Sequence, residues 1–122
     1  MDKIVNLLKE KGLTLSCAES LTGGLFASSI TDVSGASNVF KGGIVSYTNE
    51  IKENVLGVSS STLKNQGAIS EECCFQMAQN VKNKFNTDIG ISFTGNAGPT
   101  ASENKPVGLV YFGVSYLNKC EV

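Results

Sequence analysis

The chain has 122 residues, of which 41% are hydrophobic, so we expect one compact domain that buries roughly two-thirds of its unfolded surface. Ten Lys and no Arg stand against 11 acidic residues, for a formal net charge of −1, and no basic patch of the size that nucleic-acid binding requires is present. There is no His, which excludes Ser-His-Asp and Cys-His catalysis and imidazole metal sites. A hydrolase of this composition must use Lys, a carboxylate or a phenol as its base.

The start of the chain and its cysteines indicate a cytoplasmic protein. The first residues lead into an amphipathic segment, and no apolar run approaches the ~20 residues of a membrane span. The four cysteines lack the Cys-x-x-Cys spacing of a zinc or redox site, and the simplest interpretation is buried or half-buried thiols. We therefore expect no membrane contact, no nucleic-acid partner, no metal and no other cofactor.

The first half of the chain alternates between helix and strand patterns. Apolar residues at helical spacing begin directly after Met1, and Gly12 is well placed to end that helix. The predicted elements that follow the same reasoning are, in chain order, a helix at 2–11, a strand at 13–18, a helix at 22–32, a loop at 34–38, a strand at 40–48, and short helices at 49–57 and 60–66.

The second half holds the strongest helix prediction, at 70–86. Ser70 is a suitable N-cap, and the acidic pair that follows it lies where the helix dipole favours anions. A strand at 88–94 then ends in a Gly-rich loop at 95–99, and a long strand is predicted at 107–117. Helices interleaved with strands predict a layered α/β fold.

The first candidate site is the turn that follows the strand at 13–18. Ser20, Thr22, Gly23 and Gly24, with Glu19 beside them, place hydroxyls and exposed backbone N–H groups at a helix start. α/β proteins hold an anionic group or a reacting carbonyl in this way. The simpler alternative is a capped helix start with a solvated Glu19.

The second candidate site is the Ser-Gly-Ala-Ser segment that ends at Ser37, followed by Tyr47 and Lys52. A serine nucleophile needs a base, and without His a Lys of lowered pKa is the leading candidate. The alternative for Lys52 is an exposed surface lysine on a helix.

The third candidate site is the segment from Thr94 to Pro99, where a strand opens into a Gly-rich loop. Alone it is a generic turn, although ligands in α/β sheets favour the carboxyl ends of strands. Neither Gly-x-Gly-x-x-Gly nor the P-loop pattern occurs, so dinucleotide and nucleoside-triphosphate sites are weakly supported.

Several segments, in one order, resemble a known family, the CinA C-terminal domain, also known as the nicotinamide-nucleotide amidohydrolase family. Together they cover most of residues 4–117, and their joint occurrence is far more specific than any one of them. The segments are Cys17–Gly24, Thr31–Ser37, Gly43–Glu50, Lys52, Leu56–Val58, Gly67–Glu71, Thr94–Pro99 and Lys105–Gly108.

The resemblance implies a cytoplasmic three-layer α/β/α domain with a mixed central sheet. It also implies hydrolysis of the carboxamide of nicotinamide mononucleotide, with nicotinate mononucleotide and ammonia as products of a Ser/Lys mechanism. Carried over by position, Ser37 is the nucleophile and Lys52 its base, Ser20 and Tyr47 support that pair, and Thr94 lies close to it.

Substrate contacts are expected from the two glycine-containing turns. Backbone N–H groups in such turns bind phosphate or an oxyanion. The expected substrate-binding residues are Thr22, Gly23, Gly24, Thr94, Gly95, Asn96 and Gly98.

One departure from the family pattern leaves two functions open. Family members continue past the strand near Tyr116 into another strand and a long basic C-terminal helix that contributes an Arg, whereas this chain has no Arg and ends at Val122. We therefore expect residues 1–122 to be a single domain without that last strand and helix. The two hypotheses are an amidohydrolase and a catalytically weak nucleotide-binding or interaction module. An uncovered strand at 107–117 further predicts a homo-oligomer, most simply a dimer.

Overall fold

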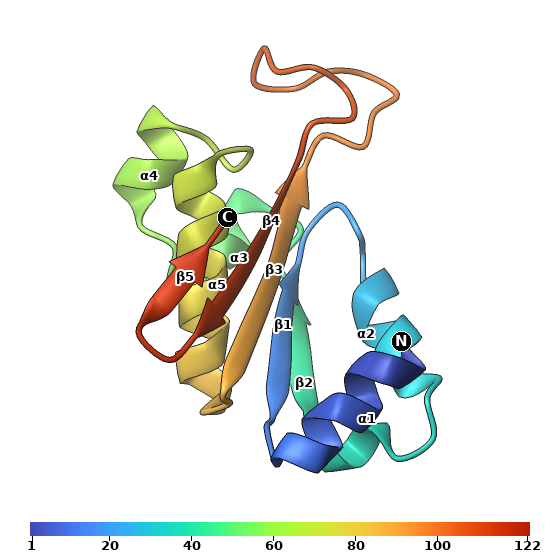
Figure 1. Ribbon diagram of the computed structural model, residues 1–122. Coiled ribbons are helices and arrows are strands. Elements are labelled where there is room, and N and C mark those ends of the chain that lie inside the picture. Colours follow the sequence, from blue (N-terminus) through green and yellow to red (C-terminus); the bar gives the residue numbers. More distant parts are fainter.

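The computed structural model shows a five-stranded sheet with helices packed on both of its faces (Figure 1). None of the helices combines the length and the apolar composition that crossing a bilayer requires. The elements in chain order are α1 (Asp2–Lys11), β1 (Leu15–Glu19), α2 (Leu25–Thr31), a 3-10 turn η1 (Ala36–Asn38), β2 (Phe40–Val45), α3 (Asn49–Asn54), α4 (Ser60–Asn65), α5 (Glu71–Phe85), β3 (Ile89–Gly95), β4 (Val110–Tyr116) and β5 (Lys119–Glu121).

The sheet is mixed, with the strand order β2-β1-β3-β4-β5. The strands β2, β1 and β3 are parallel, and Glu19 at the end of β1 pairs with Val45 of β2 and Phe93 of β3. The strands β4 and β5 are antiparallel to their neighbours. The carboxyl ends of the three parallel strands therefore meet at one edge of the sheet, where α/β proteins most often bind ligands.

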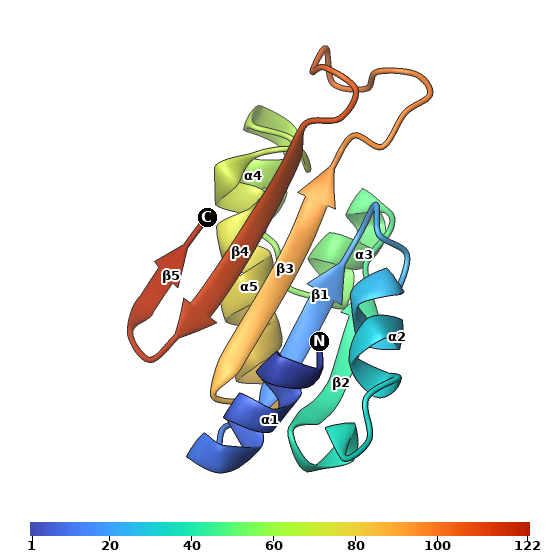
Figure 2. The ribbon, with the colours of Figure 1, turned by 45° about the vertical axis from the view of Figure 1, so that its right-hand side comes forward.

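Two helical layers enclose the sheet, which confirms the predicted three-layer α/β/α fold. Figures 1 and 2 show α1 and α2 on one face, and α5 with α3 and α4 on the other. Each face has its own apolar core. The core under α1 and α2 contains Val5, Leu8, Leu15, Ile30, Ala36 and Val39. The core under α5 contains Ala18, Leu56, Val58, Ala68, Cys73, Met77 and Val81.

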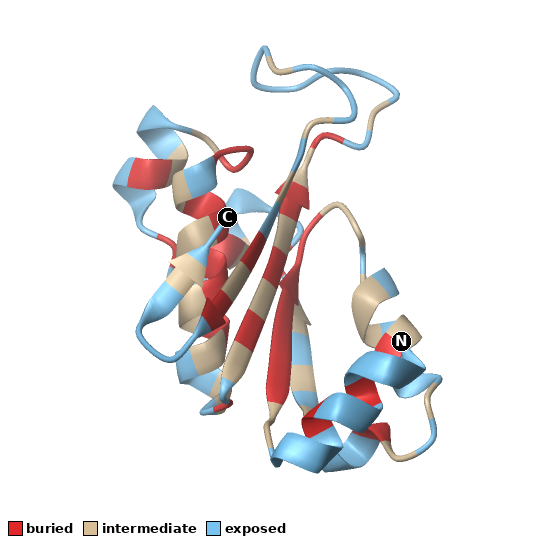
Figure 3. Ribbon diagram, in the orientation of Figure 1, coloured by how far each residue is buried: buried red, intermediate tan, exposed pale blue.

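The helix α5 packs unusually close to β3, because the sheet offers it only small side chains. The strand β1 is buried throughout and β3 alternates along its length (Figure 3). A Cβ at Gly90 would lie 2.3 Å from the carbonyl oxygen of Ala78, and the hydroxyl of Ser92 donates to the carbonyl of Cys74 at 2.7 Å.

The predicted N-cap of α5 is confirmed, since Ser70 Oγ accepts from the N–H of Cys73 at 3.2 Å.

The end of the chain differs from the sequence prediction. Residues 119–121 form β5, which pairs with β4 through a turn that places Leu117 at a φ of 55°. The strand at 107–117 is therefore paired on both sides, which corrects the expectation that it forms an uncovered edge of the sheet. A strand of three residues, two of them charged, is too short to show an alternating pattern.

One face of β4 is apolar and exposed. Val110, Phe112 and Tyr116 are 46%, 50% and 40% exposed, whereas Gly113 and Ser115 on the opposite face are buried. This confirms that one side of the strand leaves apolar side chains uncovered. The homo-oligomer that we infer from it stays a prediction.

Candidate active site

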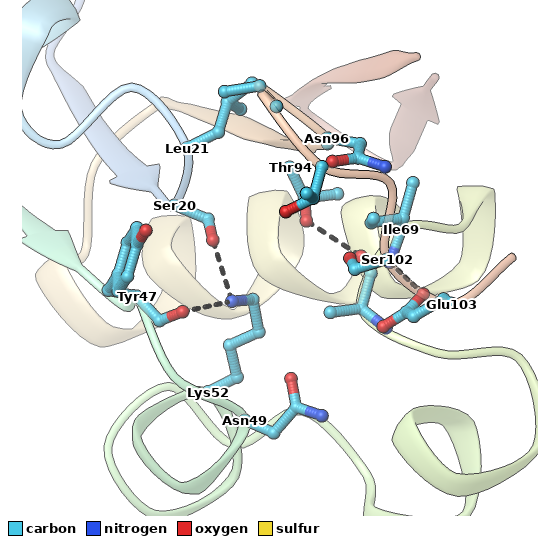
Figure 4. Close-up of a pocket in the computed structure, with 15 residues that line it drawn as sticks. Ser20, Leu21, Tyr47, Asn49, Lys52, Ile69, Thr94, Asn96, Ser102 and Glu103 are labelled. Carbon is cyan, nitrogen blue, oxygen red and sulfur yellow. Dashed lines mark hydrogen bonds between the residues drawn. The ribbon is translucent and has the colours of Figure 1, made fainter. Parts of the chain in front are cut away.

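The site forms where the three parallel strands end. Ser20 follows β1, Tyr47 lies two residues beyond β2, and Thr94 is near the end of β3. The short helix α3 then brings Lys52 back toward these strand ends (Figure 4). This helix begins where it does because the hydroxyl of Thr48 accepts from the backbone N–H of residue 51 at 3.2 Å.

Lys52 is the centre of the site and is almost completely buried. Lys52 is 1% exposed, so the alternative of an exposed surface lysine on a helix does not apply. The ammonium nitrogen Nζ lies 2.8 Å from Ser20 Oγ, 2.7 Å from the carbonyl oxygen of Ser46 and 3.3 Å from that of Tyr47. Burial lowers the pKa of Lys52 below its ordinary value, and Cys73 and Glu103 offset only part of that effect.

These three contacts allow Lys52, once its amine is neutral, to take a proton from Ser20. The carbonyl groups of Ser46 and Tyr47 can only accept hydrogen bonds, so each must face an N–H of Lys52. A neutral amine then has its lone pair left for the third neighbour, the hydroxyl of Ser20. That hydroxyl can donate, and the pair has the geometry of a nucleophile and its general base.

A pocket of about 330 Å³ opens beside Ser20 and Lys52. Its walls come from the Ser20 turn, from residues at the end of β2 and the start of α3, and from the segment after β3. Thr94 is 1% exposed and its hydroxyl donates to the carbonyl of Ala68 at 2.7 Å. The Asn96 side chain donates to the carbonyl of Lys105 at 3.0 Å and holds its own loop together.

The far wall of the pocket is fixed by Glu103. Its carboxylate accepts from the backbone N–H groups of Ala68 and Ile69 at 2.9 and 3.1 Å and pairs with Lys105 at 3.1 Å. Burial raises the pKa of Glu103, but the two N–H groups and Lys105 outweigh it, so this pKa lies below its ordinary value. Lys105 also donates to the carbonyls of Gln66 and Ile69. We refer to these contacts as the Glu103–Lys105 clasp.

The expected substrate contacts divide between the two turns. Thr94, Gly95, Asn96 and Gly98 line the pocket, whereas Thr22, Gly23 and Gly24 do not.

The physical reason is that the two glycines of the Ser20 turn use their N–H groups within the chain. The N–H of Gly24 donates to the carboxylate of Glu19 at 3.1 Å, and that of Gly23 to the carbonyl of Ser20 at 3.1 Å. A substrate phosphate cannot take these two donors, which corrects the expectation for Gly23 and Gly24.

The structure does not bring Ser37 to Lys52. Ser37 is exposed and lies in η1, just before Phe40, which pairs with Leu15 at the start of β1. Ser20 follows the other end of β1, and at about 3.3 Å per residue the two serines lie roughly 15 Å apart along the sheet. The expected Ser37–Lys52 pair is therefore corrected to a Ser20–Lys52 pair.

Tyr47 takes part in the site through its backbone. Its carbonyl accepts from Lys52, while its side chain is 71% exposed and lies at the pocket mouth. The phenol of Tyr47 is not buried, as the phenol of a supporting base would have to be. The expected role of Tyr47 in holding Lys52 is thus met by a main-chain atom.

Sequence reasoning missed the contributions of Ser46, Glu103 and Lys105, and it underrated Glu19. Main-chain contacts such as that of Ser46 leave no signal in the residue type. Glu103 and Lys105 lie in a segment without regular structure, so no periodicity marks them. Glu19 did carry a signal, because a carboxylate directly before a polar turn and a helix start is typical of capping.

A family model described as the CinA C-terminal domain matches residues 1–122. The chain belongs to this family. Curated relatives of the CinA C-terminal domain agree with this assignment. A protein of Bacillus cytotoxicus named as a competence-damage inducible protein is 55% identical over 113 residues, which are 93% of this chain and 27% of that protein. A homologue of the same name from Bacillus thuringiensis is 55% identical over 114 residues. This CinA domain thus spans just over a quarter of the length of the curated relatives it matches.

Solved structures of the CinA superfamily have the same fold. The competence damage-inducible protein A of Klebsiella pneumoniae superposes with a TM-score of 0.95 at 31% identity, over 98% of this chain and 74% of that one. The competence/damage-inducible protein of Agrobacterium tumefaciens gives 0.93 at 38% identity, over 98% and 73% of the two chains. The β-sheet order and the layers described above are therefore those of the CinA superfamily.

Proposed function

We propose that this CinA domain is a cytoplasmic amidohydrolase that deamidates nicotinamide mononucleotide, with Ser20 as nucleophile and Lys52 as general base. The observation that carries the proposal is the buried Lys52 amine 2.8 Å from the Ser20 hydroxyl, beside a pocket. A chain without His has few other ways to activate a serine. The choice of substrate rests on the family resemblance.

The chemistry follows from the surroundings of Lys52. Ser20 Oγ attacks the carboxamide carbon while its proton passes to the neutral amine of Lys52. The carbon–nitrogen bond then breaks, and the leaving group takes that proton from Lys52 and departs as ammonia. Water next attacks the carbon of the Ser20 ester and gives a proton to Lys52. The bond between that carbon and Ser20 Oγ then breaks, Oγ takes the proton back from Lys52, and the carboxylic acid leaves. No step requires a metal.

An ammonia-release assay tests this proposal directly. Purified protein is incubated with nicotinamide mononucleotide, and nicotinate mononucleotide is followed by chromatography alongside ammonia. We expect equal amounts of both products, and none from Ser20→Ala. Turnover that persists in Ser20→Ala would contradict the assignment of the nucleophile, and absence of turnover in the unaltered chain would contradict the activity.

A specific observation favours a second candidate, a nucleotide-binding module with weak catalysis. The chain has no Arg, Lys52 is committed to the site, and Lys105 is held by Glu103 and two carbonyl groups. No free cation therefore lines the pocket to compensate a substrate phosphate. Calorimetric binding of nicotinamide mononucleotide without ammonia release would support this candidate over the enzyme.

A further inference from the structure

The side chain of Glu19 closes the turn that carries Ser20. Glu19 is 1% exposed, and its carboxylate accepts from the backbone N–H groups of Gly24 at 3.1 Å, Phe26 at 3.1 Å and Ala27 at 2.9 Å. These donors lie five to eight residues further along the chain. One side chain thus spans the segment from the end of β1 to the first turn of α2.

The backbone of Glu19 holds the other side of the site. Its carbonyl accepts from the N–H of Ser46 at 2.7 Å and from the Ser46 hydroxyl at 3.2 Å. Ser46 in turn offers its own carbonyl to Lys52. Glu19 therefore connects α2 with the strand end that orients Lys52, and Ser20 lies between these two attachments.

The carboxylate of Glu19 stays charged although it is buried. Burial raises its pKa, but hydrogen bonding from Thr22 and the three backbone N–H groups outweighs this, and the pKa lies below its ordinary value. The Thr22 hydroxyl is buried and has no other hydrogen-bond partner within the chain. The adjacent Cys17 thiol, 3.7 Å away, stays protonated because burial raises its pKa to about 12. Backbone donors rather than a cation thus compensate this charge.

The same turn contains a free backbone donor next to the nucleophile. Leu21 lines the pocket, and its N–H makes no hydrogen bond within the chain. In hydrolases with a nucleophile on a sharp strand-to-helix turn, the residue after the nucleophile donates its N–H to the oxyanion. The direction of that N–H depends on the conformation that Glu19 imposes.

We propose that Glu19 is a positioning residue: its carboxylate fixes the turn so that Ser20 Oγ stays on Lys52 Nζ and the Leu21 N–H serves as an oxyanion donor. Glu19 does not itself touch the substrate. The kinetic part of its test rests on the proposed amidohydrolase function, so a second readout without substrate is included.

The kinetic test compares two carboxylates that accept backbone N–H groups. In Glu19→Gln the shape is kept, but an NH2 group faces backbone donors. The matched control is Asp88→Asn, because Asp88 accepts from the N–H of Thr14 at 2.8 Å at the other end of the sheet. We expect kcat of Glu19→Gln to fall at least about tenfold with KM within about twofold, and both values to be unchanged in Asp88→Asn.

The second readout is the titration of Lys52 Nζ, followed by NMR in ¹⁵N-lysine-labelled protein and assigned with Lys52→Met. In Glu19→Gln we expect the pKa of Lys52 to rise toward its ordinary value, because the amine loses Ser20 and gains water. Asp88→Asn should leave it unchanged. If the unaltered chain releases no ammonia, the proposed function fails, whereas this titration still decides the role of Glu19.

A folded Glu19→Gln variant with unchanged kcat and an unchanged Lys52 titration would overturn the proposal. If Glu19→Gln does not fold, Glu19→Asp takes its place. The shorter side chain keeps the charge but cannot reach all three donors. We then expect a smaller loss of kcat and a smaller shift of the Lys52 titration, and wild-type values of both would overturn the proposal.

Discussion

The two ends of the sheet each carry a serine beside a small-residue turn, and only one of them is equipped for catalysis. At the carboxyl end, Ser20 is 7% exposed and touches a buried amine. At the amino end, Ser37 is exposed, and its hydroxyl makes no hydrogen bond. The difference shows that the base and the burial, rather than the residue type, distinguish a candidate nucleophile from a surface serine.

The strongest test of this comparison exchanges each serine for alanine. We expect Ser20→Ala to lower kcat/KM for nicotinamide mononucleotide by at least about a thousandfold, because the nucleophile is lost. Ser37→Ala is the matched control and should retain the wild-type value. The measurement is ammonia release at equal concentrations of folded protein. A large loss in Ser37→Ala with activity kept in Ser20→Ala would reverse the assignment.

Lys52→Met tests whether the buried amine contributes more to the catalytic rate than to the free energy of unfolding. Met fills a similar volume but cannot accept a proton, so we expect a loss of kcat of about a thousandfold or more. The variant leaves two carbonyl groups without donors but also removes the cost of burying an amine. The free energy of unfolding in urea should therefore change by less than about 2 kcal/mol. A variant that unfolds outright would assign Lys52 a mainly structural role.

The pH dependence of activity should report Lys52 alone. Burial lowers the pKa of Lys52. The active neutral amine is therefore populated at pH values below the ordinary lysine pKa of about 10.4. We expect kcat to rise with pH, following this single ionisation. The folded state then binds fewer protons than the unfolded state between the two pKa values, so stability rises with pH in that window. Rate profiles and urea titrations of the unaltered chain and of Lys52→Met check both effects. A rate that falls with rising pH would contradict Lys52 as base.

The smallest effect concerns the exposed face of β4. We expect the chain to form a homodimer through this apolar face, and Phe112→Glu to weaken the association by placing a charge within it. Sedimentation velocity over a range of concentrations measures the change. A monomer at all concentrations would contradict the prediction, and it would leave the active site unaffected.

Much of the fold could be predicted because helix and strand patterns are local. The prediction for α1 matches its bounds, and that for α5 includes its Ser70 cap. The site could be predicted only in part. Lys52 and Thr94 were expected near the site, but the partner of Lys52 depends on which strand ends meet. In the sequence, Ser37 is nearer to Lys52 than Ser20 is. The parallel pairing of β1 and β2 nevertheless places Ser37 at the opposite end of these strands from Lys52.

The Glu103–Lys105 clasp has a consequence for proteolysis. Residues 96–109 contain no helix or strand, yet the clasp attaches them midway to the turn before α5. A tethered segment behaves as two short loops rather than one long one, and each short loop has less conformational freedom than the long loop would have. Limited digestion should therefore nick the chain near the exposed Thr100 and spare Lys105, whose amine is held against carbonyl groups.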